Sequence, residues 1–390
     1  MQKRVLHIID SFGSGGAETW LLACVQYLDQ HPELNMQFDF LASGDKKGIY
    51  DDAVIGYGCK IFYEKYSLQR FFKFRKRFKE ILVQNKYIAV HDHQDFVSGW
   101  HFLAGGSALP PVRISHLHNP WNFVKNYVTS PLRWFSFRMG RRLMAWKATH
   151  ITGTSNAVMD EYGYNRSPYK KKRVAPAYCG FDVKRFSFDP SAKEKICAEF
   201  NWERNVRIAL FAGRIGTPGY EKALNQKNPS FALSVAKSLV VSGESWKFIF
   251  AGFKGVQGEA MEDEVRASGL DQHIKFAGIR NDMPVLMSAA DVLVFPSLWE
   301  GLGMVTVEAQ AAGLRTIASL DVPEEAFVAK ELAKRISLDK PANEWSEEII
   351  RFCASPLDRN AYLDKMEASG FSINNSVQRL IDLYTNAGKK

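Results

Sequence analysis

The chain has 390 residues, which is more than one ordinary hydrophobic core needs, so we expect two domains. An apolar content of 46% and a charged content of 24% are typical of a globular protein. No apolar run approaches the roughly 18 residues that span a bilayer, and the start MQKRVLHIID is too polar for a signal-peptide core. The five cysteines are scattered without a C-x-x-C pair, which argues against a disulfide framework and a cysteine zinc site and favours a reducing cytosol.

The net charge of +9 is unevenly distributed. Residues 1–183 contain 25 Lys and Arg against 15 Asp and Glu, a net charge of +10, whereas residues 184–390 contain 26 against 27, a net charge of −1. A basic surface on one half suits an acidic partner, which could be an anionic membrane, a nucleic acid or a phosphorylated substrate.

The first half begins with a predicted strand at 4–9, a glycine-rich loop SFGSGGAETW and a predicted helix at 19–28. Glu18 stands where the dinucleotide-binding fingerprint G-x-G-x-x-G has its last glycine, which weakens a dehydrogenase interpretation. The strand-like runs that follow alternate with helical stretches and predict a doubly wound α/β sheet with right-handed connections. They lie at 37–41, 60–63, 88–91, 112–116 and 150–152.

Histidine pairs end two of these predicted strands, in VHDHQD and SHLHN. Alternation along a strand places both histidines of each pair on one face of the sheet. A metal site with Asp92 or Asp95 as an additional ligand is one interpretation, and hydrogen-bonded structural histidines are the other. No further ligands converge in the sequence, so we favour the structural interpretation and expect no metal. The four histidines are His91, His93, His116 and His118.

Two basic stretches rich in aromatic residues, 68–83 and 132–147, have helical periodicity. They are either helices that lie on an anionic membrane surface or ordinary domain helices with solvated lysines and arginines. Because both occur in the half with all the excess charge, we favour membrane contact. No signature of a nucleic-acid-binding module is present, so nucleic acid is not expected as a partner.

The second half continues the alternation of strands and helices. A predicted strand at 206–212 leads to Gly213 and Arg214, and QKNPSFALSVAKSL follows as a helix. Further strands are predicted at 246–251 and 273–276, and the C-terminal segment is predicted to be helical from Asn375. These elements indicate a second doubly wound domain.

The segment 291–319, DVLVFPSLWEGLGMVTVEAQAAGLRTIAS, has the pattern of a strand, a loop and a helix. The start of such a helix carries unpaired N–H groups and a partial positive charge that favour an anion such as phosphate, and Gly301 and Gly303 permit close approach. Carboxylates repel phosphate, so Glu300 and Glu308 should contact hydroxyl-bearing parts of the same ligand. A sugar and a ribose on either side of a diphosphate would satisfy all these groups.

In this setting, SLWEGLGMVTVEAQAAGL followed by PEEA resembles the E-x7-E motif of the retaining glycosyltransferase family 4, which has the GT-B fold. The segment is similar to bacterial members that act in exopolysaccharide and capsule biosynthesis. The resemblance implies two Rossmann-like domains that face each other across a cleft. These are an acceptor-binding domain at 1–183, to which the C-terminal helix of 370–390 crosses back, and a nucleotide-sugar-binding domain at 184–369. Cys179-Gly180-Phe181-Asp182 resembles the linker between them.

The resemblance also implies the reaction, which is transfer of a hexose-type unit with retained configuration from a nucleotide diphosphate sugar, UDP in preference to GDP. The acceptor would be a hydroxyl of a glycan or a lipid-linked glycan. The residues implied as catalytic are Glu300, His118, Arg214 and Lys227. Those implied to bind the donor are Gly15, Gly16, Arg214, Lys227, Ile279, Arg280, Gly301, Leu302, Gly303, Met304 and Glu308. No cofactor and no metal are expected, because two cationic side chains and a helix start already serve the diphosphate.

One spacing departs from the family pattern. Thirteen positions separate Arg214 from Lys227, about twice the usual number, so an inserted loop at 215–226 could contact acceptor or donor, and Lys222 could replace Lys227. A nucleotide-sugar 2-epimerase of related fold and a non-catalytic sugar-nucleotide-binding protein remain alternatives. We expect a cytoplasmic protein, with attachment to the inner face of the plasma membrane as a further hypothesis.

Overall fold

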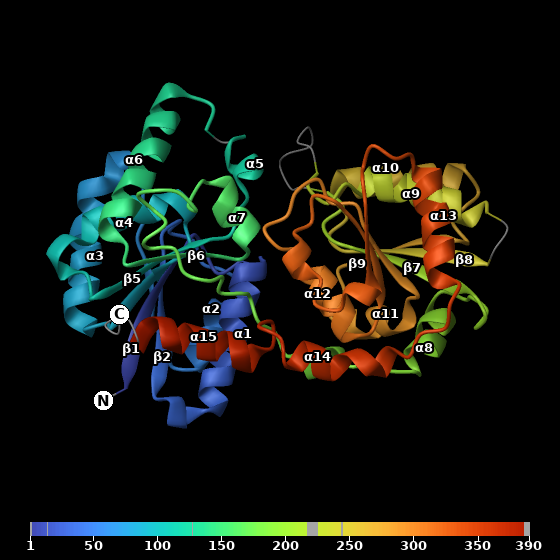
Figure 1. The fold of residues 1–390 in the computed structure, drawn as a ribbon, viewed down its shortest axis with the longest axis horizontal. Coiled ribbons are helices and arrows are strands. Elements are labelled where there is room, and N and C mark those ends of the chain that lie inside the picture. The colour runs from blue at the N-terminus through green and yellow to red at the C-terminus, as the bar shows by residue number, and fades with distance from the viewer. Residues whose placement is uncertain (1, 14, 127, 217–224, 243–244, 386–390) are drawn as a thin grey trace. The chain divides into compact units, whose positions relative to one another are not determined.

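The computed structural model describes residues 2–13, 15–126, 128–216, 225–242 and 245–385. The chain divides into two compact units (Figure 1), of which unit 1 comprises Met1–Phe181 with Gly370–Lys390 and unit 2 comprises Asp182–Ser369. Unit 2 begins two residues before the boundary expected from the sequence, because Asp182 caps the first turn of the 3-10 helix Val183–Phe186 by accepting hydrogen bonds from the N–H groups of Lys184 and Arg185.

Unit 1 contains a parallel sheet with the strand order β3-β2-β1-β4-β5-β6. The central strands are buried on both faces, which explains their nearly continuous apolar sequences. The strands are β1 Lys3–Ile9, β2 Met36–Ala42, β3 Ile61–Tyr63, β4 Ala89–Asp92, β5 Val112–Leu117 and β6 His150–Gly153. Each lies within one or two residues of a predicted run.

Helices cover both faces of this sheet (Figure 1). On one face α1 packs against the last helix of the chain, α15, and the Trp20 indole N–H donates a hydrogen bond of 2.9 Å to Ser376 Oγ. Elsewhere α4 packs against α3 and α6; a Cβ at Gly99 would lie 2.0 Å from the Gly140 carbonyl oxygen, so only glycine permits this approach. The helices are α1 Gly16–Gln30, α2 Asp51–Gly56, α3 Phe71–Asn85, α4 Ser98–Gly105, α5 Trp121–Val124, α6 Pro131–Lys147, α7 Asn156–Glu161 and α15 Ile373–Thr385.

Unit 2 contains a second parallel sheet, with the order β12-β11-β10-β7-β8-β9. Its strands are β7 Arg207–Ala212, β8 Trp246–Ala251, β9 Ile274–Gly278, β10 Val292–Phe295, β11 Arg315–Ser319 and β12 Ala333–Ile336. Its helices are α8 Ala192–Glu199, α9 Pro229–Val240, α10 Gly255–Ala267, α11 Met283–Ala289, α12 Met304–Ala311, α13 Ala342–Cys353 and α14 Leu363–Glu367. Trp246, Phe248, Phe250 and Trp345 form the centre of its core.

Both sheets have the same topology when each is followed from its first strand. The order reverses direction between β1 and β4 in unit 1 and between β7 and β10 in unit 2. Ligands of open α/β sheets bind outside the carboxyl ends of the strands at such a switch point. The predicted α/β class with two doubly wound domains is therefore confirmed, and the switch points show where sites should be sought. Short 3-10 helices, η1 to η8, complete the fold at Pro32–Leu34, Leu68–Arg70, Asp95–Val97, Gly106–Ala108, Val183–Phe186, Glu324–Ala326, Lys330–Leu332 and Arg359–Tyr362.

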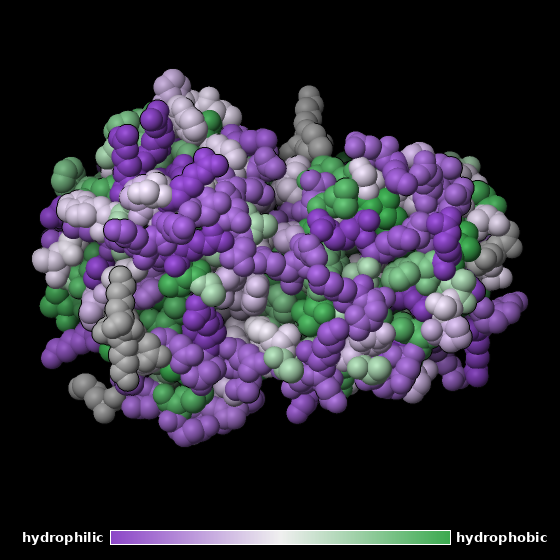
Figure 2. Space-filling model, in the orientation of Figure 1, coloured by the Kyte–Doolittle hydropathy of each residue, from purple (hydrophilic) through white to green (hydrophobic). Residues whose placement is uncertain are grey.

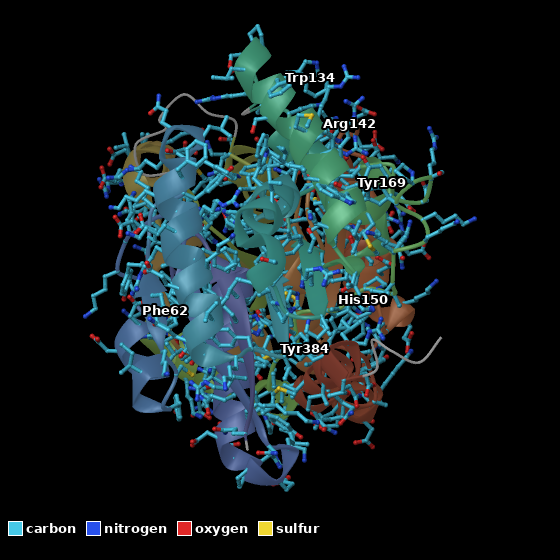
Figure 3. All side chains as sticks on the ribbon, turned by 90° about the vertical axis from the view of Figure 1, so that its left-hand side faces the viewer. Phe62, Trp134, Arg142, His150, Tyr169 and Tyr384 are labelled. Carbon is cyan, nitrogen blue, oxygen red and sulfur yellow. The ribbon has the colours of Figure 1, made fainter. Side chains whose placement is uncertain are left out.

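The two basic stretches are helical but differ in how they bury their aromatic side chains. In α3, Phe74 and Phe78 are fully buried, so the apolar side of this helix serves the core of unit 1. In α6, Phe137 and Met144 are buried, whereas four large apolar side chains remain exposed: Leu132, Trp134, Phe135 and Trp146. Figure 3 shows Trp134 near one end of this helix. No helix in the part of the chain that the structure describes has the length and apolar content required to cross a bilayer.

Candidate functional site

A buried ion pair lies at the carboxyl end of β10. Glu300 is 7% exposed, and its Oε1 lies 2.6 Å from Lys227 Nζ. Ser297 Oγ donates to the same carboxylate oxygen, and Gln226 Nε2 donates to the other oxygen at 3.3 Å. A carboxylate at this depth needs a cation and hydrogen-bond donors to offset its lost hydration, and these three residues supply them. Sequence reasoning placed Lys227 on a diphosphate and Glu300 on a sugar, and it did not anticipate that the two would pair with each other.

Glycines at the ends of β7 and β8 make room for Lys227. A Cβ at Gly213 would lie 3.1 Å from Lys227 Cγ, and a Cβ at Gly252, whose φ is +141°, would lie 2.0 Å from the Gly213 carbonyl oxygen. The ammonium itself lies 4.8 Å from the centroid of the Phe295 ring. The stem of Lys227 therefore runs along the end of β7 while its charge reaches the end of β10, so the lysine connects the two strands of the switch point.

Arg214 follows Gly213 and its side chain is exposed. Its backbone is held in place, because Asn225 Nδ2 donates to the carbonyl oxygens of Arg214 and Ile215. Within the described residues the guanidinium forms no hydrogen bond or ion pair, and its exposure makes it accessible to a ligand. Lys222, the alternative to Lys227, lies outside the described residues, as does most of the inserted loop.

The loop after Glu300 leads directly into α12, whose N-terminal N–H groups begin at this end of the sheet. Gly303 caps the helix with a φ of +91°, a conformation that L side chains rarely adopt, and a Cβ there would lie 3.2 Å from Val322 Cγ1. Leu302 is buried beneath the loop, while Gly301 and Met304 are partly exposed. The predicted strand, loop and helix are thus confirmed, with a helix start suited to an anion.

Glu308 lies one turn into α12 and is half-buried. Burial raises the pKa of its carboxyl to about 7, against the opposing effects of the Arg185 and Lys227 charges. Its protonation therefore changes near neutral pH.

Ile279 and Arg280, which the resemblance implies to bind the donor, follow β9 directly. Ile279 is 71% exposed. Arg280 is held by ion pairs with the carboxylates of Glu199 and Asp282, which raise the pKa of the guanidinium. The Arg280 side chain is thus occupied by structural contacts, which leaves main-chain groups for any ligand here.

In unit 1, Gly15 and Gly16 stand at the start of α1, with Gly15 as the cap. A Cβ at Gly15 would lie 2.3 Å from Glu18 Oε2, so the glutamate side chain occupies the space that any larger residue would need. Burial raises the pKa of Glu18. Among the residues that the structure describes, a Cβ at Gly16 would meet no other group within 4 Å, so there is open space beside this glycine.

Five histidine rings gather on one face of the unit 1 sheet. The register aligns His7 of β1 with His91 of β4, and alternation brings His93, His116 and His118 to the same face. They form two hydrogen-bonded rows. The first row joins His7 Nδ1 to His93 Nε2 at 3.0 Å and His93 Nδ1 to His118 Nε2 at 2.9 Å. The second row joins Tyr384 Oη to His91 Nδ1 at 2.7 Å and His91 Nε2 to His116 Nδ1 at 3.1 Å. Sequence reasoning missed His7 and Tyr384. The position of His7 among apolar residues of β1 could have identified it from the sequence. Tyr384 could not be identified in this way, because it lies near the other end of the chain.

Burial and mutual repulsion hold these rings in the neutral form. Burial lowers the pKa of His7 and of His118 to about 3 and shifts the pKa of His91, His93 and His116 in the same direction. Two groups of three bring one nitrogen from each ring within 4.8 Å of one another, namely His7, His91 and His93, and His93, His116 and His118. Nitrogen ligands are therefore close enough for a metal to be considered.

The two aspartates that the metal interpretation would use as additional ligands are engaged in other contacts. Asp92 points to the opposite face of the sheet and lies 2.7 Å from His101 Nδ1. Asp95 accepts hydrogen bonds from the backbone N–H of His118 at 2.9 Å and from the Asn119 side-chain amide at 2.8 Å. Burial raises the pKa of Asp95 to about 6, although these hydrogen bonds oppose the shift. The structural role of Asp95 is to fix the loop that carries His118.

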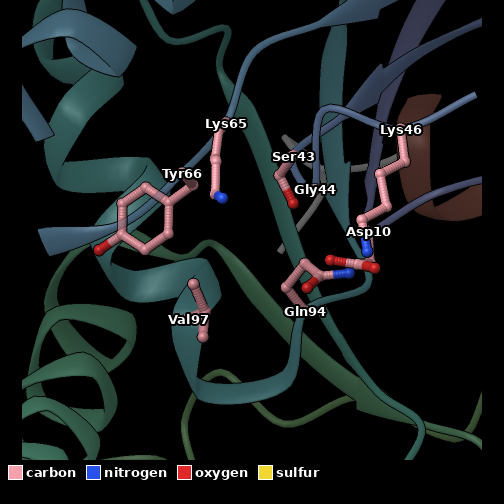
Figure 4. Close-up of a pocket in the computed structure, with 8 residues that line it drawn as sticks. All are labelled: Asp10, Ser43, Gly44, Lys46, Lys65, Tyr66, Gln94 and Val97. Carbon is pink, nitrogen blue, oxygen red and sulfur yellow. The ribbon is translucent and has the colours of Figure 1, made fainter. Parts of the chain in front are cut away.

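A pocket of about 300 Å³ opens at the carboxyl ends of β1 to β4 (Figure 4). Two lysines and one aspartate line it, together with polar groups from four successive strand ends. The lining residues are Asp10, Ser43, Gly44, Lys46, Lys65, Tyr66, Gln94 and Val97. Sequence reasoning did not identify this pocket, because its residues are separated by loops and form no motif.

Two family models match successive parts of the chain. Residues 193–367 match "Glycosyl transferases group 1", and residues 14–185 match "Glycosyltransferase Family 4". Together the two matches include the candidate donor-site residues of unit 2 as well as His118 and Gly15.

Similar proteins extend over the full length. EpsF of Bacillus subtilis (strain 168), which carries the name of a glycosyltransferase, is 29% identical over 100% of this chain and 98% of its own. The capsular polysaccharide biosynthesis glycosyltransferase CapH of Staphylococcus aureus is 23% identical over 98% of each chain. Among solved structures, HepE of Anabaena in complex with UDP aligns with a TM-score of 0.76 at 16% identity over 98% of this chain and 100% of its own. The same protein has also been solved with UDP-glucose.

Proposed function

Because the chain belongs to the group 1 and family 4 glycosyltransferases and has the GT-B fold, we propose that it is a retaining hexosyltransferase that uses a nucleotide diphosphate sugar. The proposed donor carrier is UDP in preference to GDP, which is supported by the UDP and UDP-glucose complexes of HepE. The observation that carries the proposal is the Lys227–Glu300 ion pair, which lies at the switch point of the unit 2 sheet beside the start of α12.

The donor site follows from the charges and donors at this end of the sheet. Arg214 and Lys227 bind the diphosphate and stabilise the negative charge that develops on it as the sugar departs. The N–H groups at the start of α12, from Gly301 to Met304, contribute further donors. When the diphosphate binds, the Lys227 ammonium is shared between phosphate and Glu300. No metal is then required for charge neutralisation.

Carboxylates and backbone groups bind the rest of the donor. Glu300 orients the sugar, held in place by Ser297 and Gln226, and Glu308 accepts hydrogen bonds from the ribose hydroxyls. Main-chain groups of Ile279 and Arg280 contact the base. In unit 1, His118 contacts the sugar and Gly15 and Gly16 approach the donor phosphate. The leaving phosphate oxygen accepts the proton of the incoming hydroxyl.

The proposed acceptor is a glycan or lipid-linked glycan in bacterial polysaccharide biosynthesis. Full-length similarity to EpsF and to the capsule enzyme CapH supports this class. The pocket in unit 1 supports it as well, because Asp10 and Gln94 can bind sugar hydroxyls while Lys46 and Lys65 attract a phosphate on the same molecule.

We further propose that the protein is cytoplasmic and attaches peripherally to the anionic inner face of the plasma membrane through α6. Leu132, Trp134 and Phe135 are exposed on the first turns of this helix, and Arg138 and Arg142 are exposed further along it. Strongly hydrophilic side chains gather over this part of unit 1 (Figure 2). Exposed aromatic groups with adjacent cations are typical of interfacial helices.

A donor panel tests the reaction. Thermal stabilisation by UDP-, GDP- and ADP-sugars should identify the carrier, and the best donor with a lipid-linked glycan acceptor should give a product with retained anomeric configuration by NMR. Release of a free epimerised sugar nucleotide without acceptor would indicate an epimerase. Tight binding of a donor with neither transfer nor slow hydrolysis would indicate a non-catalytic binding protein.

Sedimentation with liposomes tests the membrane proposal separately. The protein should sediment with vesicles that contain anionic lipid at moderate salt, and a variant with Trp134→Ser and Phe135→Ser should not. The matched control is Phe72→Ser on α3, which removes another exposed aromatic group, 81% exposed, and should leave sedimentation unchanged. Absence of wild-type protein from the pellet would count against membrane attachment.

A further inference from the structure

The row of rings that ends at His118 is continuous from the interior of unit 1 to its surface. His7 is fully buried, His93 is 6% exposed, and His118 is partly exposed beyond the carboxyl end of β5. Each adjacent pair is hydrogen-bonded through ring nitrogens, at 3.0 Å and 2.9 Å. Trp20 of α1 packs edge-on against His93. The geometry therefore links the interior ring to the ring proposed to contact the sugar.

Neutral rings make such a row directional. A neutral imidazole has one N–H donor and one lone-pair acceptor. When all three rings are neutral, the ring that donates in one hydrogen bond must accept in the next. One choice of tautomer at either end of the row therefore determines the tautomers of all three rings.

The interior end of the row decides between the two directions. His7 Nε2 is buried and has no hydrogen-bond partner in the described part of the chain. If it carried the proton, a buried N–H would be stranded, and orphaned buried N–H groups are the rarer kind in proteins. We therefore place the His7 proton on Nδ1, from which it is donated to His93 Nε2. His93 then donates from Nδ1 to His118 Nε2.

We propose that His7 and His93 are positioning residues that hold His118 in the Nδ1–H tautomer. The exposed end of the row then presents a fixed hydrogen-bond donor, suited to a sugar hydroxyl or ring oxygen, with no positive charge. This inference rests on the proposed function only in naming the sugar as the partner of His118. Asp95 completes the arrangement by binding the backbone N–H of His118, so both the position and the donor of the ring are determined.

A metal site is the competing interpretation of the same rings. Three imidazoles on Zn²⁺ must direct their lone pairs to one point at about 2.0–2.1 Å. Here the nitrogens of the row face one another in pairs at hydrogen-bond distance, and neighbouring rings stack, with His91 and His93 at 4.4 Å and His116 and His118 at 4.2 Å between centroids. Parallel stacked rings direct their nitrogens side by side instead of to a common point. The hydrogen-bonded row therefore explains the geometry better.

Long-range ¹H–¹⁵N correlation spectra of the full-length protein, labelled at histidine, report the tautomer of each ring directly. The spectrum of the wild type should show His118 protonated on Nδ1. His93→Leu removes the donor and should shift His118 to a mixture dominated by Nε2–H, the tautomer that an isolated histidine prefers. His93→Asn places an amide N–H near the former Nδ1 and should preserve the wild-type tautomer.

His116→Leu is the control for packing, because it removes a buried ring that stacks on His118 but whose hydrogen bond is to His91. It should leave the His118 tautomer unchanged, so a general loosening of the sheet is distinguished from loss of the row. Melting temperatures of all variants establish that each is folded. In transfer assays, kcat should fall about tenfold in His93→Leu and recover in His93→Asn.

Three results would overturn the inference. These are an Nε2–H tautomer of His118 in the wild type, an unchanged tautomer in His93→Leu, and one equivalent of bound zinc by mass spectrometry that is lost in His93→Leu. If the wild type transfers no sugar from any donor, the proposed function is wrong. The tautomer spectra still test the role of His7 and His93, because they do not depend on activity.

Discussion

The two units use one topology for opposite chemistry. At the switch point between β7 and β10, a partly exposed lysine and a buried glutamate form an ion pair, and Arg214 lies exposed beside it. In unit 1, uncharged histidine rings and a tyrosine cover one face of the sheet at β1, β4 and β5, and charged groups line the pocket at the strand ends. The parallel sheet dictates only that strand ends converge there. The side chains at those ends determine what is bound.

The difference corresponds to the two parts of the proposed substrate. A diphosphate needs positive charge, and cations in a partly dry site stabilise it far more strongly than they would in water. A sugar is neutral and is distinguished by the directions of its hydroxyls. Uncharged hydrogen-bond donors in fixed positions can recognise these directions without binding other anions. Variants in each unit should therefore have different effects.

Lys227→Met should have the largest effect on transfer, because the variant lacks the ammonium group that is proposed to bind the diphosphate and that pairs with Glu300. We expect a loss of about 100- to 1,000-fold in kcat, measured with saturating donor. The variant should also be destabilised, since it leaves a buried carboxylate without its partner, a change that typically costs about 3–5 kcal/mol.

A second substitution separates these two effects. Lys227→Met combined with Glu300→Gln should recover much of the stability in urea denaturation while transfer stays low. Lys237→Met is the matched control, because its ammonium pairs with Glu264 near the surface, and its turnover should lie within twofold of wild type. Wild-type turnover in Lys227→Met would remove this lysine from the donor site.

Arg214→Ala should have the next largest effect, at least tenfold in kcat/KM, because one exposed charge contact to the diphosphate is lost. Stability should barely change, since the side chain is exposed. Arg266→Ala provides the comparison, because its guanidinium pairs with Asp263 on the surface of α10. Near-normal turnover in Arg214→Ala would show that the exposed arginine does not bind the donor.

Glu308→Gln should change how stability depends on pH. The folded-state pKa of Glu308 is raised to about 7 from an ordinary value of 4.5, so the folded protein binds this proton more tightly than the unfolded chain does. The folded state of the wild type therefore loses stability as pH rises from about 4.5 through about 7, and Glu308→Gln lacks this loss.

The difference in melting temperature between variant and wild type measures this effect. Between pH 5 and pH 8 the melting temperature of Glu308→Gln should rise relative to that of the wild type. Saturating UDP should reduce this difference if the ionised carboxylate binds the ribose. Parallel pH dependences for the two proteins would show that Glu308 does not titrate in this range.

Chelation should have the smallest effect. Side chains and the start of α12 supply the positive charge in the donor site, so transfer in excess EDTA should equal that in its absence. The measurement is initial rate at fixed donor after dialysis against chelator. A complete loss that magnesium restores would contradict metal-independent transfer.

Several features followed from the sequence with good accuracy because they are local. The period-2 and helical patterns predicted the strands of unit 1 and β7 to β9 of unit 2 within one or two residues, and a strand, loop and helix where β10 and α12 lie, whereas β11 and β12 were not predicted. Gly301 and Gly303 predicted the loop and helix start after it, since glycine marks a backbone that needs φ > 0 or close approach. For α3 and α6 the sequence pattern could not distinguish core packing from membrane contact; the structure buries Phe74 and Phe78 of α3, whereas several aromatic groups of α6 are exposed.

The partnerships of these residues were decided by tertiary structure. The sequence pattern alone placed Glu300 in a loop after a strand, and it placed the two histidines of each pair, His91 with His93 and His116 with His118, on one face. The structure determined that Lys227 pairs with Glu300 across 73 positions, that His7 completes the row to His118, and that Tyr384 reaches His91 from 293 residues away. The physical reason is that strand and helix periodicity arise from neighbours in the chain, whereas a buried charge or imidazole takes whichever partner the packing of distant elements brings within about 3 Å.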